Sequence, residues 1–287
     1  MQSIKTRILP ENNYRAVFID GKTIRQKLDQ SKPILPLQYP ELEDWAINSL
    51  CFANCPQCYV SATKRGENFP NIISKVRELY NGLDDNLKPF QVAIGGAGEP
   101  TIHPEFIDFI RTVNELGIMP NYTTNGMHLT SEIIDATAAY CGGVALSYHP
   151  HIANVFFRTA LTDLQSINTK LNIHVIIGEA GSVDRFWKLY SELTGIDYFV
   201  LLPYQAVGRA KTIDVEKEWQ SLFESLAKAN ISNIAFGALF YEYLKEHNIK
   251  DIIDVNIYEP EVFSGYRIFD NFYKVLRKSS FNPQPKF

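Results

Sequence analysis

The stretch Cys51–Tyr59 reads CFANCPQCY and holds three of the chain's four cysteines within eight positions. The spacing Cys51-x3-Cys55-x2-Cys58 brings three thiolates together in one tight loop. Tetrahedral zinc takes four protein ligands, or three and a water, and an electron-transfer [4Fe–4S] cluster usually takes four cysteines. Three thiolates in one loop therefore favour an iron–sulfur cluster with one iron open to another molecule. A zinc loop or chance crowding stays open as the alternative.

Around this loop the sequence predicts alternating strands and helices. Short apolar runs recur from Trp45 onward, and the segments between them carry apolar residues at helical spacing. Such alternation predicts a parallel sheet. Six or more units favour a barrel or open barrel that works at the carboxyl ends of its strands. The predicted strands are WAINSL from Trp45, FQVAIGG from Phe90, IMPNYTT from Ile118, GVALSY from Gly143, NIHVIIG from Asn172 and YFVLLP from Tyr198.

Unusual polar clusters follow the first four predicted strands. They are Cys51–Cys58, Gly96–Glu99, Thr124–Gly126 and Ser147–His151, in chain order. Because the carboxyl ends of parallel strands meet at one rim, we expect these clusters to lie together there.

The cysteine loop and the GAGEP turn at Gly96–Pro100 together resemble the radical S-adenosylmethionine (SAM) enzymes. The resemblance covers about residues 45–210. It implies an α/β fold, a partial or near-complete (β/α) barrel related to the TIM barrel, and an oxygen-sensitive [4Fe–4S] cluster. It also implies that the open iron chelates SAM and that one electron cleaves SAM to a 5′-deoxyadenosyl radical. That radical would abstract hydrogen from a substrate that the sequence does not identify.

The resemblance also implies roles for individual residues, although it identifies no catalytic residue. Gly96, Ala97 and Gly98 match the turn whose backbone approaches the methionine amino group, where small side chains permit close contact. Glu99 matches the acidic member of that motif. The expected metal ligands are Cys51, Cys55 and Cys58, and the expected cofactor-binding residues are Gly96, Ala97, Gly98, Glu99, Asn125, Ser147 and Arg209.

Two residues of the cysteine loop depart from the family pattern or are ambiguous. Gln57 stands where the family usually places an aromatic residue near the adenine, which puts that contact in doubt. Tyr59 follows the third cysteine, and we expect it in the core rather than at the site.

Other polar residues of the predicted rim have two interpretations each. His149 and His151, with Tyr148, either face substrate or are exposed loop residues. His174 either points into the barrel or is a core histidine with satisfied hydrogen bonds. Arg209, which follows Gln205 after the sixth strand, either binds a carboxylate of SAM or substrate or forms a surface salt bridge. Asn125 either belongs to the site or serves only a structural turn.

The fourth cysteine, Cys141, has no partner in sequence and is expected to be a buried thiol outside any metal site. No cysteine follows it in this sequence, so we expect a single iron–sulfur cluster.

Regions outside the predicted core also have expected structures. AVFIDGKTI (Ala16–Ile24) predicts a hairpin around Asp20-Gly21, followed by a proline-rich connector. The aromatic-rich tail predicts a second hairpin within FSGYRIFDNFYKVL. The expected division is an N-terminal extension and connector at 1–44, the core barrel at 45–210, and barrel completion with an extension at 211–287.

The overall composition indicates which classes of partner are not expected. The 287 residues are 45% hydrophobic and 21% charged, with a formal net charge of −4, so no basic field indicates nucleic acid. No apolar run reaches the ~20 residues that span a membrane, and the N-terminus lacks a secretory signal, so we expect a cytoplasmic protein.

The expected function is therefore a radical SAM enzyme of unknown specific reaction. Its expected partners are SAM, an electron donor such as flavodoxin or ferredoxin, and a substrate that is a small molecule or a peptide side chain. The alternative function is a non-catalytic metal- or cluster-binding protein with a structural or sensory role.

Overall fold

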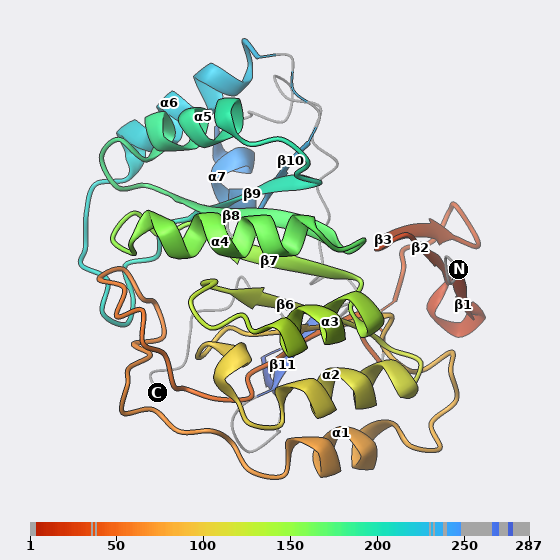
Figure 1. Cartoon of the computed structure of the whole chain (residues 1–287). Helices are drawn as coiled ribbons and strands as arrows, with labels where there is room; N and C mark the ends of the chain where they lie inside the picture. Colours follow the sequence, from red (N-terminus) through yellow and green to blue (C-terminus); the bar gives the residue numbers. More distant parts are fainter. Residues whose placement is uncertain are drawn as a thin grey trace.

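The computed structural model describes residues 4–35, 37, 39–229, 231, 233–237, 240–247, 266–269 and 275–277. Its main element is a nine-stranded sheet in the order β10-β9-β8-β7-β6-β5-β4-β11-β12. Strands β4 to β10 run parallel and curl into a half-barrel with the helices on its outer face (Figure 1). A separate antiparallel sheet of β1, β2 and β3 lies at one end.

The elements in chain order are β1 (Lys5–Leu9), the 3-10 turn η1 (Pro10–Asn12), β2 (Tyr14–Ile19), β3 (Lys22–Lys27), β4 (Leu42–Trp45), α1 (Ile72–Tyr80), β5 (Gln91–Ile94), η2 (Pro100–Ile102), α2 (Phe106–Glu115), β6 (Met119–Thr124), α3 (Ser131–Tyr140), β7 (Gly143–Ser147), α4 (Asn154–Gln165), β8 (Lys170–Ile177), α5 (Ser182–Glu192), β9 (Tyr198–Pro203), α6 (Glu216–Leu226), β10 (Ile234–Phe236), α7 (Phe240–Glu246), β11 (Tyr266–Phe269) and β12 (Val275–Arg277).

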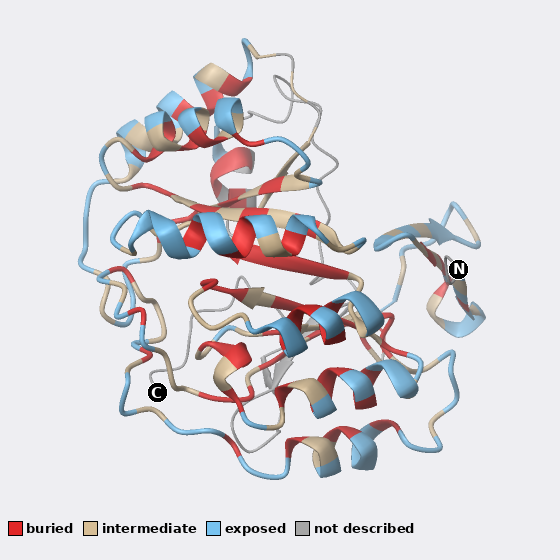
Figure 2. Cartoon of the chain, in the orientation of Figure 1, coloured by how far each residue is buried: buried red, intermediate tan, exposed pale blue. Residues whose placement is uncertain are grey.

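Period-2 alternation along the strands separates the core from the inner face. Ile173 and Val175 of β8 are buried beneath the helices, whereas His174 and Ile176 between them line a cavity on the concave side. Adjacent residues of a strand point to opposite faces, so one strand serves both surfaces. Figure 2 shows the buried residues concentrated where helices meet the sheet.

The small N-terminal sheet covers the amino ends of the parallel strands. Its β2–β3 turn has positive φ at Asp20 (51°) and Gly21 (73°), as a two-residue hairpin turn requires. Asp20 forms a salt bridge of 2.9 Å with Lys170, the first residue of β8. The ammonium of Lys22 lies 5.7 Å from the ring centroid of Tyr198, the first residue of β9. One end of the half-barrel is therefore closed by this sheet.

The fold confirms the predicted open α/β barrel, with three corrections. The sheet does not close as a full TIM barrel does, because β10 and β12 are the outer strands of the described sheet. The first strand ends at Trp45 rather than beginning there. The N-terminal hairpin is confirmed, but β1 adds a third strand that the sequence analysis did not predict.

The C-terminal strands extend the parallel sheet at both of its edges, and completion of the barrel by residues 211–287 stays a prediction. β10 extends the parallel order beyond β9, but β11 pairs in parallel with β4. The predicted tail hairpin is confirmed for the paired strands β11 and β12, and the rest of that tail lies outside the described residues. Among the helices that the structure describes, none combines the length and apolarity needed to cross a membrane.

Candidate functional site

A cavity of about 410 Å³ opens at the carboxyl ends of the parallel strands. The cysteine loop, the turn after β5 and the ends of β6, β7, β8 and β9 form its walls. It is lined by Asp44, Cys51, Ala53, Cys55, Gln57, Cys58, Tyr59, Val60, Ala62, Ala93, Ile94, Gly95, Gly96, Ala97, Gly98, Glu99, Thr123, Thr124, Asn125, Ser147, Tyr148, His149, His174, Ile176 and Leu202. All four polar clusters predicted at one rim therefore meet in this cavity.

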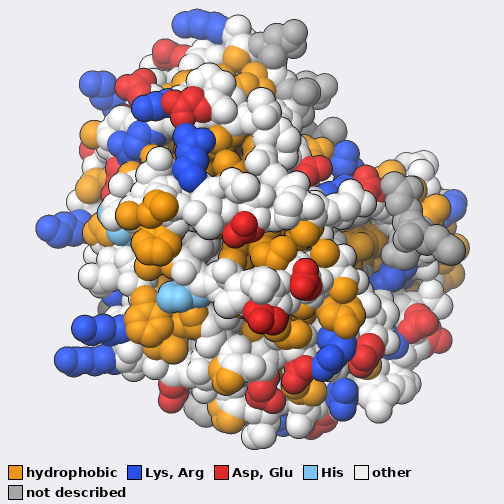
Figure 3. Space-filling model, viewed as in Figure 1, with side chains coloured by type: hydrophobic (Ala, Val, Ile, Leu, Met, Phe, Trp, Pro, Cys, Tyr) orange, Lys and Arg blue, Asp and Glu red, His pale blue; other side chains and the backbone are white. Residues whose placement is uncertain are grey.

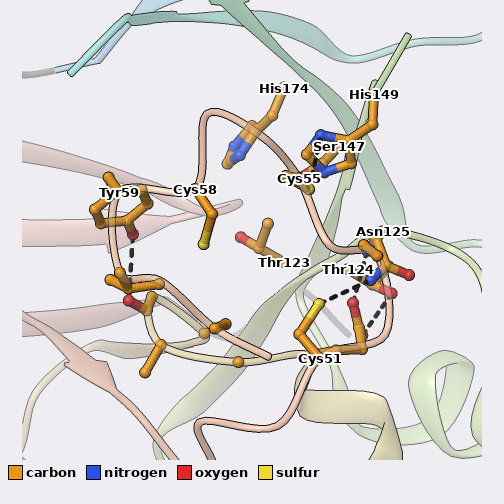
Figure 4. A pocket seen from close by; sticks show the side chains of 18 of the residues that line it. Cys51, Cys55, Cys58, Tyr59, Thr123, Thr124, Asn125, Ser147, His149 and His174 are labelled. Atoms are coloured by element: carbon orange, nitrogen blue, oxygen red, sulfur yellow. Dashed lines mark hydrogen bonds between the residues drawn. The ribbon is translucent and has the colours of Figure 1, made fainter. Parts of the chain in front are cut away.

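Backbone hydrogen bonds fix the conformation of the cysteine loop. The Cys51 amide donates to the Thr63 carbonyl at 3.0 Å, and the Cys58 amide donates to the Cys55 carbonyl at 3.2 Å. Asn54 adopts the left-handed conformation (φ 50°), which turns the chain between the first two cysteines. As a result, the three sulfurs border the same cavity (Figure 4).

The chemistry of the three sulfurs fits a metal cluster. Burial raises the pKa of Cys51, and burial with the two neighbouring cysteines raises the pKa of Cys55 to about 12. A bound cation would favour the thiolate forms of Cys51 and Cys55 at neutral pH. The side-chain amide of Asn125 donates to the Cys51 sulfur at 3.7 Å, which orients that sulfur.

The GAGEP turn packs directly on the chain that leads into the cysteine loop. A Cβ on Gly98 would lie 2.3 Å from Asn48 Oδ1 and 2.6 Å from the Leu50 carbonyl oxygen, so only glycine fits there. The Glu99 amide donates to that same carbonyl at 2.8 Å, and Asn48 donates to the Glu99 carbonyl at 2.7 Å. These contacts hold the second predicted motif against the first.

The Glu99 carboxylate is buried and accepts hydrogen bonds from three other residues. Its donors are the amide and hydroxyl of Thr101 at 3.3 and 2.7 Å, the Thr124 hydroxyl at 2.8 Å and the Asn125 amide at 2.8 Å. Burial raises the pKa of Glu99, and these donors oppose that rise. Through these contacts Glu99 joins the turn after β5 to the end of β6. Its contact with the cofactor stays a prediction.

The opposite part of the turn is more accessible. Gly96 is exposed and has φ 82°, a conformation that glycine adopts without strain. The Tyr59 hydroxyl donates to the Gly96 carbonyl at 3.3 Å, and the Tyr59 side chain lines the cavity. The expectation that Tyr59 belongs to the core was therefore wrong: its ring joins the cysteine loop to the glycine turn.

Strands β7 and β8 supply the third wall. Ser147, the last residue of β7, is paired in register with His174 of β8, and both line the cavity. Burial lowers the pKa of His174 to about 4, so its imidazole is neutral at pH 7. Beyond Ser147, the His149 ring turns toward the cysteine loop and places Nδ1 3.8 Å from the Cys55 sulfur (Figure 4).

Arg209 lies behind the cysteine loop rather than in the cavity wall. Its guanidinium donates to the Cys55 carbonyl at 3.1 and 3.2 Å, and its amide donates to the Cys58 carbonyl at 3.0 Å. These contacts are to backbone carbonyls, and the predicted contact of Arg209 with a carboxylate of SAM or substrate stays a prediction. The segment after β9 supports the loop that carries the cysteines.

The remaining predicted residues are also placed. Gln57 is buried at the cavity, and its Oε1 has no hydrogen-bond partner among the described residues. Cys141 ends α3 and packs against the main core, outside the cavity, and burial raises the pKa of its thiol. It is half-buried rather than fully buried, and its expected place outside any metal site stays a prediction.

Two cavity or support residues were missed by the sequence analysis. Thr123 lines the cavity from β6, and strand alternation could have identified it, since it follows the buried Tyr122. Asn48 positions the glycine turn through its contact with Glu99. No sequence pattern marks Asn48, because its role depends on a contact between distant segments.

Searches against family models found no match. Two curated relatives are each 31% identical to the chain over 36% of its length. One is the tungsten-containing aldehyde ferredoxin oxidoreductase cofactor-modifying protein of Pyrococcus furiosus, and the other is the mycofactocin maturase MftC of Mycobacterium tuberculosis. The matched segments, of 106 and 107 residues, cover 28% and 26% of those relatives, so the similarity spans about a quarter of their length.

Solved structures share the fold over most of the chain. Streptococcus suis SuiB bound to S-adenosylmethionine has a TM-score of 0.64 at 16% identity, covering 84% of this chain and 74% of SuiB. Native anSMEcpe with bound AdoMet and the Cp18Cys peptide has a TM-score of 0.57 at 13% identity, covering 85% and 75% of the two chains. The chain therefore shares the half-barrel fold of these two AdoMet-bound structures, and its cysteine triplet and GAGEP turn meet at one cavity of that fold.

Proposed function

We propose that this protein is a radical SAM enzyme that cleaves SAM reductively and abstracts hydrogen from a peptide side chain. The observation that carries the proposal is the single cavity bordered by Cys51, Cys55, Cys58 and the GAGEP turn. The three cysteines would hold a [4Fe–4S] cluster, since three thiolates leave one iron open. When bound and reduced, the cluster and SAM supply a 5′-deoxyadenosyl radical.

The protein's own residues prepare this chemistry by holding two loops together. Asn125 orients the Cys51 sulfur, and Arg209 supports the backbone at Cys55. Glu99 fixes the turn after β5 to the end of β6. Such preorganisation keeps reacting groups in place and excludes water.

The accessible backbone of Gly96 and Ala97 suits the polar end of SAM. Gly96 has no side chain, and Ala97 has a small one, so a ligand can approach their peptide groups closely. The Ser147 hydroxyl lies on the facing wall and can both donate and accept a hydrogen bond. These contacts with SAM remain part of the proposal.

A peptide substrate is supported by the relatives and by the cavity. MftC is named a maturase, a related SuiB structure contains its precursor peptide SuiA (TM-score 0.59, 18% identity), and anSMEcpe was solved with a peptide. In this chain Ile176 and Leu202 give the inner wall an apolar portion that an aliphatic or aromatic side chain would fit.

The electron would come from a small electron-transfer protein such as flavodoxin or ferredoxin. Phe52, next to Cys51, is 49% exposed and contacts the ring of His128 with centroids 5.5 Å apart. The nearby turn carries the exposed cations Lys64 and Arg65. Figure 3 shows hydrophobic side chains gathered around a histidine on one side of the molecule. A partly apolar, positively charged surface beside Cys51 suits an acidic donor.

The decisive experiment measures 5′-deoxyadenosine from anaerobically purified protein with a rebuilt cluster, SAM and a strong reductant. We expect product from the wild type and from Cys141→Ala, the matched control outside the cavity. We expect none from the variant with Cys51→Ala, Cys55→Ala and Cys58→Ala. A mixed pool of synthetic peptides should raise the rate, whereas a pool of nucleosides should not.

Other outcomes favour the alternative function. No 5′-deoxyadenosine from wild type shown to carry iron and sulfide would contradict the enzyme and favour a structural or sensory cluster protein. One zinc ion per chain with indifference to SAM would favour a structural metal site. We propose a cytoplasmic location, in keeping with free cysteines and an oxygen-sensitive cluster.

A further inference from the structure

The sequence His149-Pro150-His151 follows β7 and faces the middle cysteine of the loop. The ligand atoms of Cys55, His149 and His151 all lie within 4.8 Å of one another. The two imidazole rings have centroids 5.6 Å apart. Cys55 and His149 are half-buried, and His151 is exposed. The proposed iron–sulfur cluster uses Cys55 as a ligand but gives neither histidine a role.

The separation of the Cys55 sulfur and His149 is close to what a tetrahedral ion requires. Zinc binds sulfur at about 2.3 Å and imidazole nitrogen at about 2.0–2.1 Å, so the two ligand atoms lie roughly 3.6 Å apart at the tetrahedral angle. The Cys55 sulfur and His149 Nδ1 are 3.8 Å apart. This pair therefore needs a shift of only a few tenths of an ångström. The ligand atom of the exposed His151 lies within 4.8 Å of the other two, so a movement of roughly 1–1.5 Å completes the set.

We propose that Cys55, His149 and His151 form a mononuclear site for Zn²⁺ or a similar divalent ion. Thiolate and imidazole are ligands that zinc prefers, and three of them leave one position for water. Binding replaces the Cys55 thiol proton, which passes to solvent, and uses both imidazoles in their neutral form.

This site and the cluster exclude each other, because Cys55 serves both. That consequence rests on the proposed function, whereas the three-ligand site rests only on the geometry above. A zinc-loaded chain would hold Cys55 in a form that cannot accept a cluster. The ion would therefore keep the chain in an inactive state until it is removed.

The test uses the full chain, freed of iron and kept under reducing, oxygen-free conditions without SAM. Co²⁺ is added as a spectroscopic probe for zinc. We expect one equivalent to bind, with the visible bands of tetrahedral Co²⁺ and a charge-transfer band from a single thiolate. The same spectrum should appear in Cys51→Ala and in Cys58→Ala, and it should lose the thiolate band in Cys55→Ala.

Histidine variants separate this site from binding by the three cysteines. The double variant His149→Ala/His151→Ala should bind Co²⁺ at least tenfold more weakly, since even outer-shell partners of a metal are worth on the order of tenfold. His151→Ala alone should also weaken Co²⁺ binding, and because His151 is exposed, this variant should not disturb the fold. His247→Ala, a distant exposed histidine, is the matched control and should bind as the wild type does.

Two results would overturn the proposal. One is a spectrum that survives both histidine variants but disappears in Cys51→Ala or Cys58→Ala, since the ion would then sit on the cysteines alone. The other is an absence of tetrahedral Co²⁺ in a wild type whose circular dichroism shows it folded. Neither result depends on 5′-deoxyadenosine, so failure of this site and failure of the proposed enzyme are distinguishable.

Discussion

The two ends of the parallel strands bury polar groups in opposite ways. At the amino end, Glu41 is 1% exposed, accepts a hydrogen bond from the Tyr14 hydroxyl and pairs with Arg25, whose Nε lies 2.9 Å from it. At the carboxyl end, Cys55 has a raised pKa, and its sulfur lies 3.8 Å from His149 Nδ1.

The difference shows which end is built for stability and which for a ligand. Buried polar groups of a finished structure are paired with one another, as they are beneath the N-terminal sheet. Sulfurs gathered around a cavity are left for a partner that is not part of the chain. Four measurements test this contrast.

Removing Glu41 should have the largest effect on folding. Glu41→Ala removes the buried carboxylate that pairs with Arg25 and accepts a hydrogen bond from the Tyr14 hydroxyl, which should destabilise the protein by roughly 3–5 kcal/mol. Urea denaturation of the cluster-free chain measures this. Glu78→Ala is the control, because Glu78 forms an exposed pair with Lys75 and should change stability by less than about 1 kcal/mol. Equal effects of the two variants would contradict a stabilising amino end.

Glu99→Gln should have the next largest effect. The amide keeps the size but directs its own N–H groups at Thr124 or Asn125, which donate to Glu99 in the native structure. We expect a loss of about 2–3 kcal/mol in the free energy of unfolding, since hydrogen bonds to charged groups are worth that much. Faster loss of cluster iron should accompany it. Glu115→Gln, on the exposed end of α2, is the control. Unchanged stability in Glu99→Gln would show that the Glu99 carboxylate does not stabilise the contact between the turn after β5 and β6.

His174 should make stability depend on pH. Its pKa is about 4 in the folded protein and near 6.5 when unfolded, so between these values the unfolded chain binds more protons. Stability should therefore fall as pH drops from 6.5 toward 4, by about 1–3 kcal/mol from this residue. Urea midpoints at pH 7.5 and pH 5 measure it, with His174→Asn as the comparison. An identical pH dependence in both proteins would rule out a neutral, buried imidazole.

Tyr59→Phe should have the smallest effect. It removes the hydroxyl that donates to the Gly96 carbonyl at 3.3 Å, a contact worth about 0.5–1 kcal/mol. SAM should bind a few-fold more weakly, because the glycine turn loses one restraint, and isothermal calorimetry on the cluster-loaded protein would show it. Tyr140→Phe, at the end of α3, should leave the affinity unchanged. A Tyr59→Phe affinity equal to that of wild type would mean that the turn is held without this hydroxyl.

Much of the fold and of the site could be predicted because both are local in sequence. The run YFVLLP that ends at Pro203, for example, is apolar and forms a strand of the sheet. The three cysteines lie within one loop, so their spacing alone predicts their meeting.

The errors concern residues whose role depends on distant partners. β4 reads LEDW, and its acidic Glu43 is buried, accepting hydrogen bonds from Tyr80 and, at 3.1 Å, from Trp45. Burying a carboxylate in a strand contradicts the usual pattern unless such partners exist. The same reasoning applies to Arg209, since nothing near it in sequence indicates that it contacts the Cys55 carbonyl.

The parallel pairing of β11 with β4 bears on how the chain is made. Tyr266 pairs with Leu42 and Phe269 with Trp45, so the strand that leads into the cysteine loop gains its second neighbour only when the C-terminal region has left the ribosome. Until then β4 presents open backbone groups at a sheet edge, and such edges recruit other chains. Bringing together segments so far apart is also slow. The growing polypeptide thus carries its cysteine loop beside an unfinished edge for most of its synthesis.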